Sequence, residues 1–177
     1  AALSGQIFKS GFFQQLRTEQ QLGYVVSAFY WPILDVPGNG FMVQSHTNSA
    51  VDVAEAVNVF LQQSLGEDGL TEEQFLRHRK ALIGEILQPY KNLWEQSEFY
   101  WREISKRELN FDSRKQLAEE VAQIEFEQWR DRARIELVQN PAQMRVVAEG
   151  RWQIAPVGEA VTSSKGFQKE QSSYQVR

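Results

Sequence analysis

Cysteine is absent from the 177-residue sequence, and histidine occurs only twice. Without cysteine the chain has no disulfide bond, no cysteine nucleophile and no thiolate metal ligand, and this absence fits the cytosol as well as the periplasm. The two histidines, His46 and His78, are far apart in the sequence. A zinc site usually needs two or three nitrogen or sulfur ligands at short spacing, so we expect this chain to bind no metal of its own.

Long apolar runs and a basic excess are also lacking. No stretch approaches the roughly 18 apolar residues of a membrane-spanning helix, so no membrane association is expected. The formal net charge of −4 argues against a nucleic-acid-binding protein, which normally carries a basic excess. The first residues lack an initiator Met and the basic and apolar regions of a signal peptide. They resemble the middle of a helix, and we expect the chain to be part of a longer protein.

Familiar catalytic motifs are missing too. The sequence contains neither H-x-x-E-H nor H-E-x-x-H, no G-x-S-x-G turn and no phosphate-binding glycine-rich loop that ends in Lys followed by Ser or Thr. The basic run at residues 77–80 is expected to lie on a solvated helix face, with a contact to an anion or a partner as the alternative. His46 is expected to be an ordinary exposed histidine, with a substrate contact as the alternative. The chain by itself is therefore predicted to be inactive as an enzyme.

The beginning of the sequence predicts a helix followed by two strands. Residues 1–20 place their apolar side chains on one helical stripe, which consists of Leu3, Ile7, Phe8, Phe12 and Leu16. Gly23 is expected to end this helix, because glycine readily adopts the left-handed conformation that follows many helices. The β-branched and aromatic residues at 24–31 predict a strand, and P-G-N-G at residues 37–40 predicts a turn. A second strand, antiparallel to the first, is expected at residues 41–47.

Capping signals mark two helices further along the chain. Asn48 or Ser49 can cap the first of them, because their side chains accept hydrogen bonds from the free amides of a first helical turn. Thr71 and Gln74 form a capping box for the second. This second helix is expected to end near Pro89, since proline lacks the amide hydrogen that a helix needs.

A third helix, at residues 92–107, is rich in aromatic side chains. At helical spacing such residues more often form core than a ligand site, and we expect core packing for Trp94, Phe99, Tyr100 and Trp101. Another helical stretch is expected at residues 113–138, with a break near residues 123–124. Residues 145–148 predict a short strand.

This order of elements predicts an α+β domain over residues 1–149, in which a small antiparallel sheet is covered on one face by helices. The composition changes after that point, because Gly, Ser, Gln and Lys dominate residues 163–177. Residues 150–177 are therefore expected to form a C-terminal extension that is loosely ordered.

One stretch, at residues 12–26, is not explained by core packing or by solvated faces. Its sequence F-F-Q-Q-L-R-T-E-Q-Q-L-G-Y-V-V resembles the signature F-x-x-L-R-T-x-x-Q-L-G-Y-x-V of the insulinase/pitrilysin family of zinc metallopeptidases. The match has no gap, and it covers Phe13, Leu16, Arg17, Thr18, Gln21, Leu22, Gly23, Tyr24 and Val26. A second stretch, Y-W-R-E-I at residues 100–104 followed by L-N-F-D at 109–112, is similar to the same family. The resemblance covers residues 1–149.

The resemblance implies a specific architecture. Members of this family consist of four homologous α+β units in two halves that enclose a chamber, and the first half carries an inverted H-x-x-E-H zinc site. This chain resembles the last, zinc-free part. The resemblance therefore implies a zinc metalloendopeptidase as parent, zinc as the parent's cofactor, a peptide substrate and the N-terminal catalytic half of the same polypeptide as partner. The bacterial members imply a periplasmic location.

Two residues of the motif are implied to act on the substrate. By resemblance, Arg17 and Tyr24 reach across the chamber to the peptide beside the zinc. The Tyr24 hydroxyl is suited to donate to the carbonyl oxygen as it becomes an oxyanion, and Arg17 to hold substrate carbonyls. Two alternatives stay open: Arg17 can cap helix carbonyls while Tyr24 is a half-buried strand aromatic, and the parent can be a degenerate family member in which this domain is a non-catalytic partner or scaffold.

Overall fold

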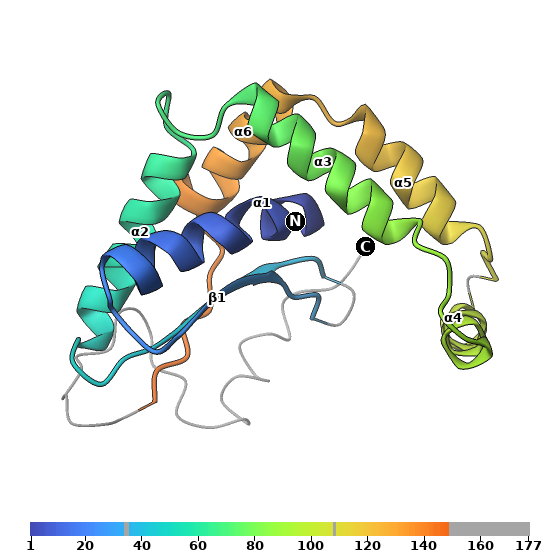
Figure 1. The fold of residues 1–177 in the computed structure, drawn as a ribbon, viewed down its shortest axis with the longest axis horizontal. Coiled ribbons are helices and arrows are strands. Elements are labelled where there is room, and N and C mark those ends of the chain that lie inside the picture. The colour runs from blue at the N-terminus through green and yellow to red at the C-terminus, as the bar shows by residue number, and fades with distance from the viewer. Residues whose placement is uncertain (34–35, 108, 149–177) are drawn as a thin grey trace, which may run out of the picture.

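The computed structural model describes residues 1–33, 36–107 and 109–148 (Figure 1). In chain order its elements are α1 (Ala2–Phe12), the π-helix η1 (Phe13–Glu19), β1 (Val25–Tyr30), β2 (Asn39–Gln44), α2 (Ala50–Ser64), α3 (Glu72–Ile86), α4 (Leu93–Ser105), α5 (Ser113–Gln123), α6 (Phe126–Arg134) and the π-helix η2 (Ile135–Gln139). The predicted α+β class is confirmed. The C-terminal extension predicted for residues 150–177 lies outside the described residues. Within the described part, no helix is long and apolar enough to cross a membrane.

The two strands form an antiparallel hairpin, as the sequence predicts. Val26 pairs with Val43 and Ala28 with Phe41, and these four residues point to the same face because side chains alternate along a strand. Val26 and Ala28 are buried, and their partners pack against the core. Figure 1 shows α1 lying along this face of the hairpin, with α3 on the other side of α1. One face of the sheet is therefore covered by helices.

The core is built around α1. Phe8 and Phe12 are almost completely buried, and both rings contact Phe60 of α2, with ring centroids 5.9 and 5.1 Å apart. From α6, Trp129 brings its ring to 6.1 Å from Phe8. The indole nitrogen of Trp129 also donates a hydrogen bond of 3.1 Å to the hydroxyl of Ser4. The first helix is thus enclosed by elements from both the middle and the end of the described chain.

The capping signals set the helix starts. Ser49 begins α2 with a capping box to Asp52, and Thr71 begins α3 with a capping box to Gln74. Asn92 accepts a hydrogen bond from the first turn of α4. These caps satisfy amides that have no partner inside the helix, which is why the short polar residues in the sequence located the helices well.

One expectation about the later part of the chain is wrong, because residues 145–148 form no strand. Another holds only in part. In the basic run at residues 77–80, Arg77 and Lys80 are exposed as expected, but Arg79 is half-buried. Its guanidinium donates to the carbonyl oxygen of Ile124 and lies over the ring of Phe75, 5.7 Å from the centroid. Ile124 is the extended residue at which the predicted break between α5 and α6 occurs, so Arg79 fixes that break against α3.

The aromatic residues of α4 are a third correction. Phe99 is buried, but Trp94 and Trp101 are 72% and 67% exposed and are not core residues. Amphipathic spacing identifies the apolar side of a helix but does not say whether another element covers that side. In Figure 1, α4 lies at the far end of α3 and α5, away from α1 and the hairpin.

A small aromatic cluster holds α4 in this position. Phe99 contacts Tyr90, with centroids 5.8 Å apart, and also Tyr100, which contacts Phe111. The guanidinium of Arg114 lies 4.6 Å from the centroid of Tyr90. Arg114 also donates hydrogen bonds to the carbonyl oxygens of Ile86 and Gln88, at 2.7 and 2.6 Å. This one side chain therefore joins α5, the end of α3 and the segment that leads into α4.

Candidate functional site

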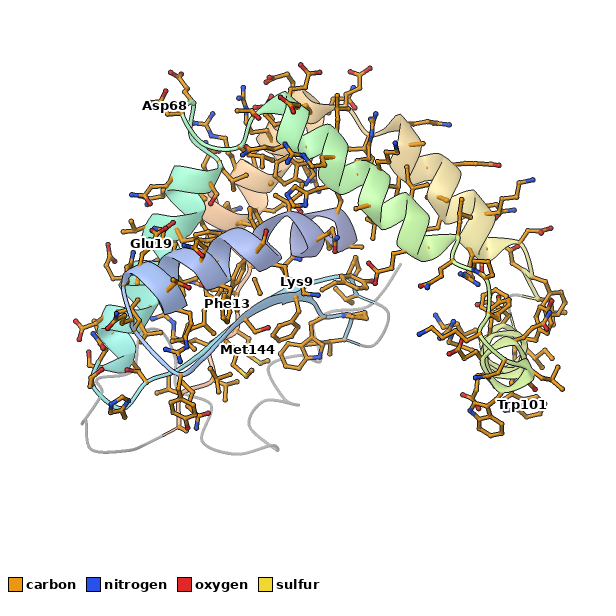
Figure 2. All side chains as sticks on the ribbon, viewed as in Figure 1. Lys9, Phe13, Glu19, Asp68, Trp101 and Met144 are labelled. Atoms are coloured by element: carbon orange, nitrogen blue, oxygen red, sulfur yellow. The ribbon has the colours of Figure 1, made fainter. Side chains whose placement is uncertain are left out.

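The signature stretch begins in an unusual helix. Helix α1 continues directly into η1, where Gln20 donates its amide to the carbonyl oxygen of Gln15, five residues earlier, at 2.9 Å. π-Helices are rare, and those that occur often lie at functional sites. In Figure 2, Phe13 and Glu19 mark the two ends of this segment. Leu16 is fully buried and anchors it, while Phe13 is 49% exposed.

The exit from η1 is a tight turn with strained backbone. Gln21 has a φ of 52°, a left-handed conformation that is uncommon for residues other than glycine and is concentrated at functional sites. The amide of Leu22 returns to the carbonyl oxygen of Leu16 at 2.9 Å. The prediction that Gly23 ends the helix is wrong, because Gln21 already occupies the left-handed position.

Gly23 is required for another reason. It is buried against β2, and a Cβ at this position would lie 2.4 Å from the carbonyl oxygen of Gln44. The next residue, Tyr24, donates its backbone amide to the same oxygen at 3.1 Å. Gly23 therefore allows the turn to close tightly onto the end of β2, and this closure fixes the start of β1.

Arg17 and Tyr24 come from the two sides of this turn. Arg17 lies in η1 and is half-buried, and Tyr24 precedes β1 and is 55% exposed. Among the described residues, no hydrogen bond or ion pair engages the Arg17 guanidinium or the Tyr24 hydroxyl. The capping of helix carbonyls by Arg17, which the sequence left open, is not found there. Both side chains thus carry hydrogen-bond donors that the described part of the chain does not use.

Contacts that the sequence did not reveal support η1. The side-chain amide of Gln15 donates to the amide oxygen of Gln63 on α2, at 2.8 Å, and Gln14 reaches Glu19 across η1 at 3.4 Å. The Gln15–Gln63 pair is distant in sequence, and no local pattern indicates it. The sequence did indicate the exposure of Phe13, because this aromatic residue lies outside the apolar stripe of residues 1–20.

The two histidines lie outside the turn between η1 and β1. His46 follows β2 and is exposed, as expected. On α3, burial lowers the pKa of His78 below its ordinary value, and the positive charge of Arg77 lowers it further. No group of three or more His, Cys, Asp or Glu side chains in the described ranges could hold a metal ion.

Comparisons with known proteins match most of the described chain. The family profile described as PQQ synthase PqqF-like, C-terminal lobe domain 4, matches residues 3–101. Protease 3 of Escherichia coli O6:H1 is 32% identical over 127 residues, which are 71% of this chain and 13% of that protein. Insulin-degrading enzyme-like 1, peroxisomal, of Arabidopsis thaliana is 34% identical over 113 residues, which are 62% of this chain and 11% of that protein.

A solved structure gives the same result for the fold. The crystal structure of pitrilysin superposes with a TM-score of 0.69 at 27% sequence identity, and the match covers 78% of this chain and 15% of that chain. This chain therefore spans only a small part of the length of the relatives that it matches.

Proposed function

The chain belongs to the insulinase/pitrilysin family, in its C-terminal part, and we propose that it is the zinc-free domain of a zinc metallopeptidase that binds peptide substrate and stabilises the oxyanion during peptide-bond hydrolysis. The relatives are named as proteases, which supports a peptidase as the parent. The residues proposed to act are Arg17 and Tyr24.

The turn between η1 and β1 is the observation that carries this proposal. It presents two side chains from fixed elements, and their donors are unused in the described part of the chain. A donor that is already positioned stabilises developing charge without reorganisation at the moment of reaction. The left-handed Gln21 and an Arg17 guanidinium without a partner among the described residues are features that functional sites concentrate.

The two side chains are proposed to have different roles. The Tyr24 hydroxyl donates one hydrogen bond to the scissile carbonyl oxygen as it gains negative charge. The Arg17 guanidinium, with several donors in a fixed plane, holds carbonyl oxygens of the bound peptide in the ground state as well. Binding and oxyanion stabilisation would then depend on different residues of one turn.

Zinc is assigned in this proposal to the N-terminal catalytic half of the same polypeptide. Bound there, it polarises the scissile carbonyl and activates water. The described residues of this chain include no group that could hold a metal, so the proposal leaves this domain inactive alone. The proposed compartment is the periplasm, although the plant relative is named as peroxisomal.

Steady-state kinetics of the full-length protein on one fluorogenic peptide tests the proposal. Arg17→Ala should raise KM and lower kcat/KM, and zinc chelation should abolish turnover. Arg77→Ala is the matched control, because Arg77 is exposed and, within the described ranges, forms its ion pair with Glu73 one helical turn away. If Arg17→Ala and Arg77→Ala have the same kinetics as the unmodified protein, a scaffold function replaces the proposed one.

A further inference from the structure

Helix α4 turns an apolar stripe toward solvent. The side chains of the stripe are Leu93, Trp94, Tyr100, Trp101 and Ile104. At 100° per residue these positions span about 120° of the helix surface, which is the width of an ordinary core-facing stripe. Leu93 is 80% exposed, and both tryptophans are more than two-thirds exposed.

Most of the stripe faces away from the rest of the described chain. Tyr100, at one edge of the stripe, is the exception, because its ring contacts Phe111. The buried residues of α4 are Phe99 and Glu103, which lie on the opposite side of the helix. In Figure 2, Trp101 projects from α4 into open space, away from α3 and α5. The helix therefore packs through its narrow inner side, and the described residues leave most of its wider apolar side uncovered.

This exposure does not come from a loosely held helix. Asn92 caps the first turn of α4. Arg114 binds the end of α3 and stacks on Tyr90, which in turn contacts Phe99. The stripe is thus presented in a fixed orientation, as a preformed contact surface is.

The spacing of the stripe fits a second helix. Leu93, Ser97, Tyr100 and Ile104 follow each other at intervals of four, three and four residues, the alternation by which side chains of one helix enter the spaces of another. Ser97 is small, and Trp94 and Trp101 flank it one turn before and one turn after. In sequence position, a small residue therefore stands between two large ones on this side of the helix, the pattern that a side chain of a facing helix can pack against.

We propose that this stripe packs against an amphipathic helix of another domain in the same polypeptide. The inference rests on the proposed function, in that it takes the domain as part of a longer peptidase chain. The matching profile is described as domain 4, in a C-terminal lobe, and the matched segment is only 13% of Protease 3. A large length of chain is therefore present in such relatives to supply the facing helix.

The size of the stripe favours a covalently linked partner over a second copy. A stable complex between separate proteins uses about 20–30 residues on each side, whereas this stripe has five apolar residues. Two domains of one chain meet at a high effective concentration, so a smaller contact is sufficient. The large rings of Trp94 and Trp101, each burying about 150–250 Å² when covered, supply most of the contact area.

Acrylamide quenching of tryptophan fluorescence tests the inference. The spectrum of a Trp94→Phe/Trp101→Phe variant of the full-length protein is subtracted from that of the unmodified full-length protein, both in the folded state and after unfolding in urea. The difference signal should be strongly quenched in urea, and at least threefold less quenched and blue-shifted in the folded protein. Trp31→Phe is the control, because Trp31 is also exposed but lies beside the hairpin.

Three results would overturn the inference: equal quenching in the folded and unfolded states, protection only after a peptide substrate is added, and a concentration-dependent dimer of the full-length protein that the double substitution abolishes. The quenching does not depend on catalysis. A full-length protein that shields these tryptophans but hydrolyses no peptide supports the inference and removes the proposed function. A full-length protein that hydrolyses peptides while both tryptophans stay accessible to acrylamide overturns the inference and leaves the proposed function standing.

Discussion

The backbone nitrogen of Tyr24 donates a hydrogen bond of 3.1 Å to the carbonyl oxygen of Gln44. This bond joins the residue before β1 to the last residue of β2, so the Tyr24 side chain starts from the end of a hairpin rather than from a loose loop. The backbone that carries the Tyr24 side chain is thereby tied to the sheet and, through the buried Val26 and Ala28, to the core. Such support is what a donor to a transition state needs.

Tyr24→Phe in the full-length protein should lower kcat by about 10²- to 10³-fold, the usual cost of removing one oxyanion donor. KM should change little, because an interaction made only in the transition state lowers kcat and kcat/KM together. Tyr30→Phe is the matched control, since Tyr30 is a similarly exposed tyrosine at the other end of β1. A Tyr24→Phe protein within threefold of the unmodified kcat would remove the role assigned to this hydroxyl.

Gly23→Ala should destabilise the chain by roughly 1–3 kcal/mol, the usual cost of a methyl group forced into a packed site. The added Cβ would meet the Gln44 carbonyl at 2.4 Å, and the turn must open. Because Tyr24 is the next residue, kcat of the full-length protein should fall as well; a shift of about 1 Å can cost 10²-fold. Thermal unfolding and kinetics measure both effects.

Gly84→Ala provides the control for that experiment. A Cβ at Gly84 meets no atom within 4 Å, and alanine favours a helix over glycine by about 1 kcal/mol. This substitution in α3 should raise the melting temperature and leave catalysis unchanged. Equal stability of the two alanine variants would contradict the close approach of Gly23 to β2.

Arg114→Leu should loosen α4 while leaving the main core folded. The substitution removes two hydrogen bonds to the carbonyls of Ile86 and Gln88 and the stacking on Tyr90, and hydrogen bonds to charged groups contribute about 1.5–3 kcal/mol each. Amide hydrogen exchange should accelerate in α4 and stay slow in α1. Arg114→Lys keeps the charge but not the planar fork, so it should rescue little. Uniform acceleration across both helices would show a global loss of stability instead.

Stability should fall as the pH falls below about 6.5, the ordinary pKa of histidine, in part through His78. Its pKa is lowered in the folded chain by burial and then by Arg77. The unfolded chain therefore binds the proton first, and the stability present above pH 6.5 is lost as the pH approaches the lower folded pKa. Urea unfolding from pH 5 to 8 measures this. His78→Gln should flatten the dependence of stability on pH in this range. Arg77→Ala should reduce that dependence less than His78→Gln does, because burial is the larger cause of the lowered pKa. An unchanged pH dependence in His78→Gln would show that His78 does not contribute to it.

Local signals in the sequence predicted most of the fold. The caps at Ser49 and Thr71 and the β-branched and aromatic residues of β1 are local signals, and the structure confirms the elements that they predict. The exposure of Trp94 and Trp101 could not be predicted, because it depends on what covers α4 and not on the helix itself. The partial burial of Arg79 was not predicted for a similar reason, since its partner, Ile124, lies at the end of another helix, α5.

The candidate site was predictable in its residues but not in its geometry. The motif located Arg17 and Tyr24, and their roles stay predictions. The π-helix was not foreseen, because a seven-residue segment is too short for its period to be told from that of an α-helix. The left-handed residue was assigned to Gly23, the usual choice, whereas the backbone places it at Gln21. Glycine was needed for the close approach to Gln44 instead.

The hydrogen bond from Trp129 to Ser4 has a consequence for biosynthesis. It joins residues 125 positions apart, so α1 waits, once it has been synthesised, for α6 before its surface is complete. Until then the ring of Phe8, which Trp129 contacts in the folded chain, lacks part of its cover, and incompletely buried apolar surface promotes aggregation. A chain truncated before α6 should therefore be retained by chaperones, whereas a chain truncated after Gln139 should bury this surface.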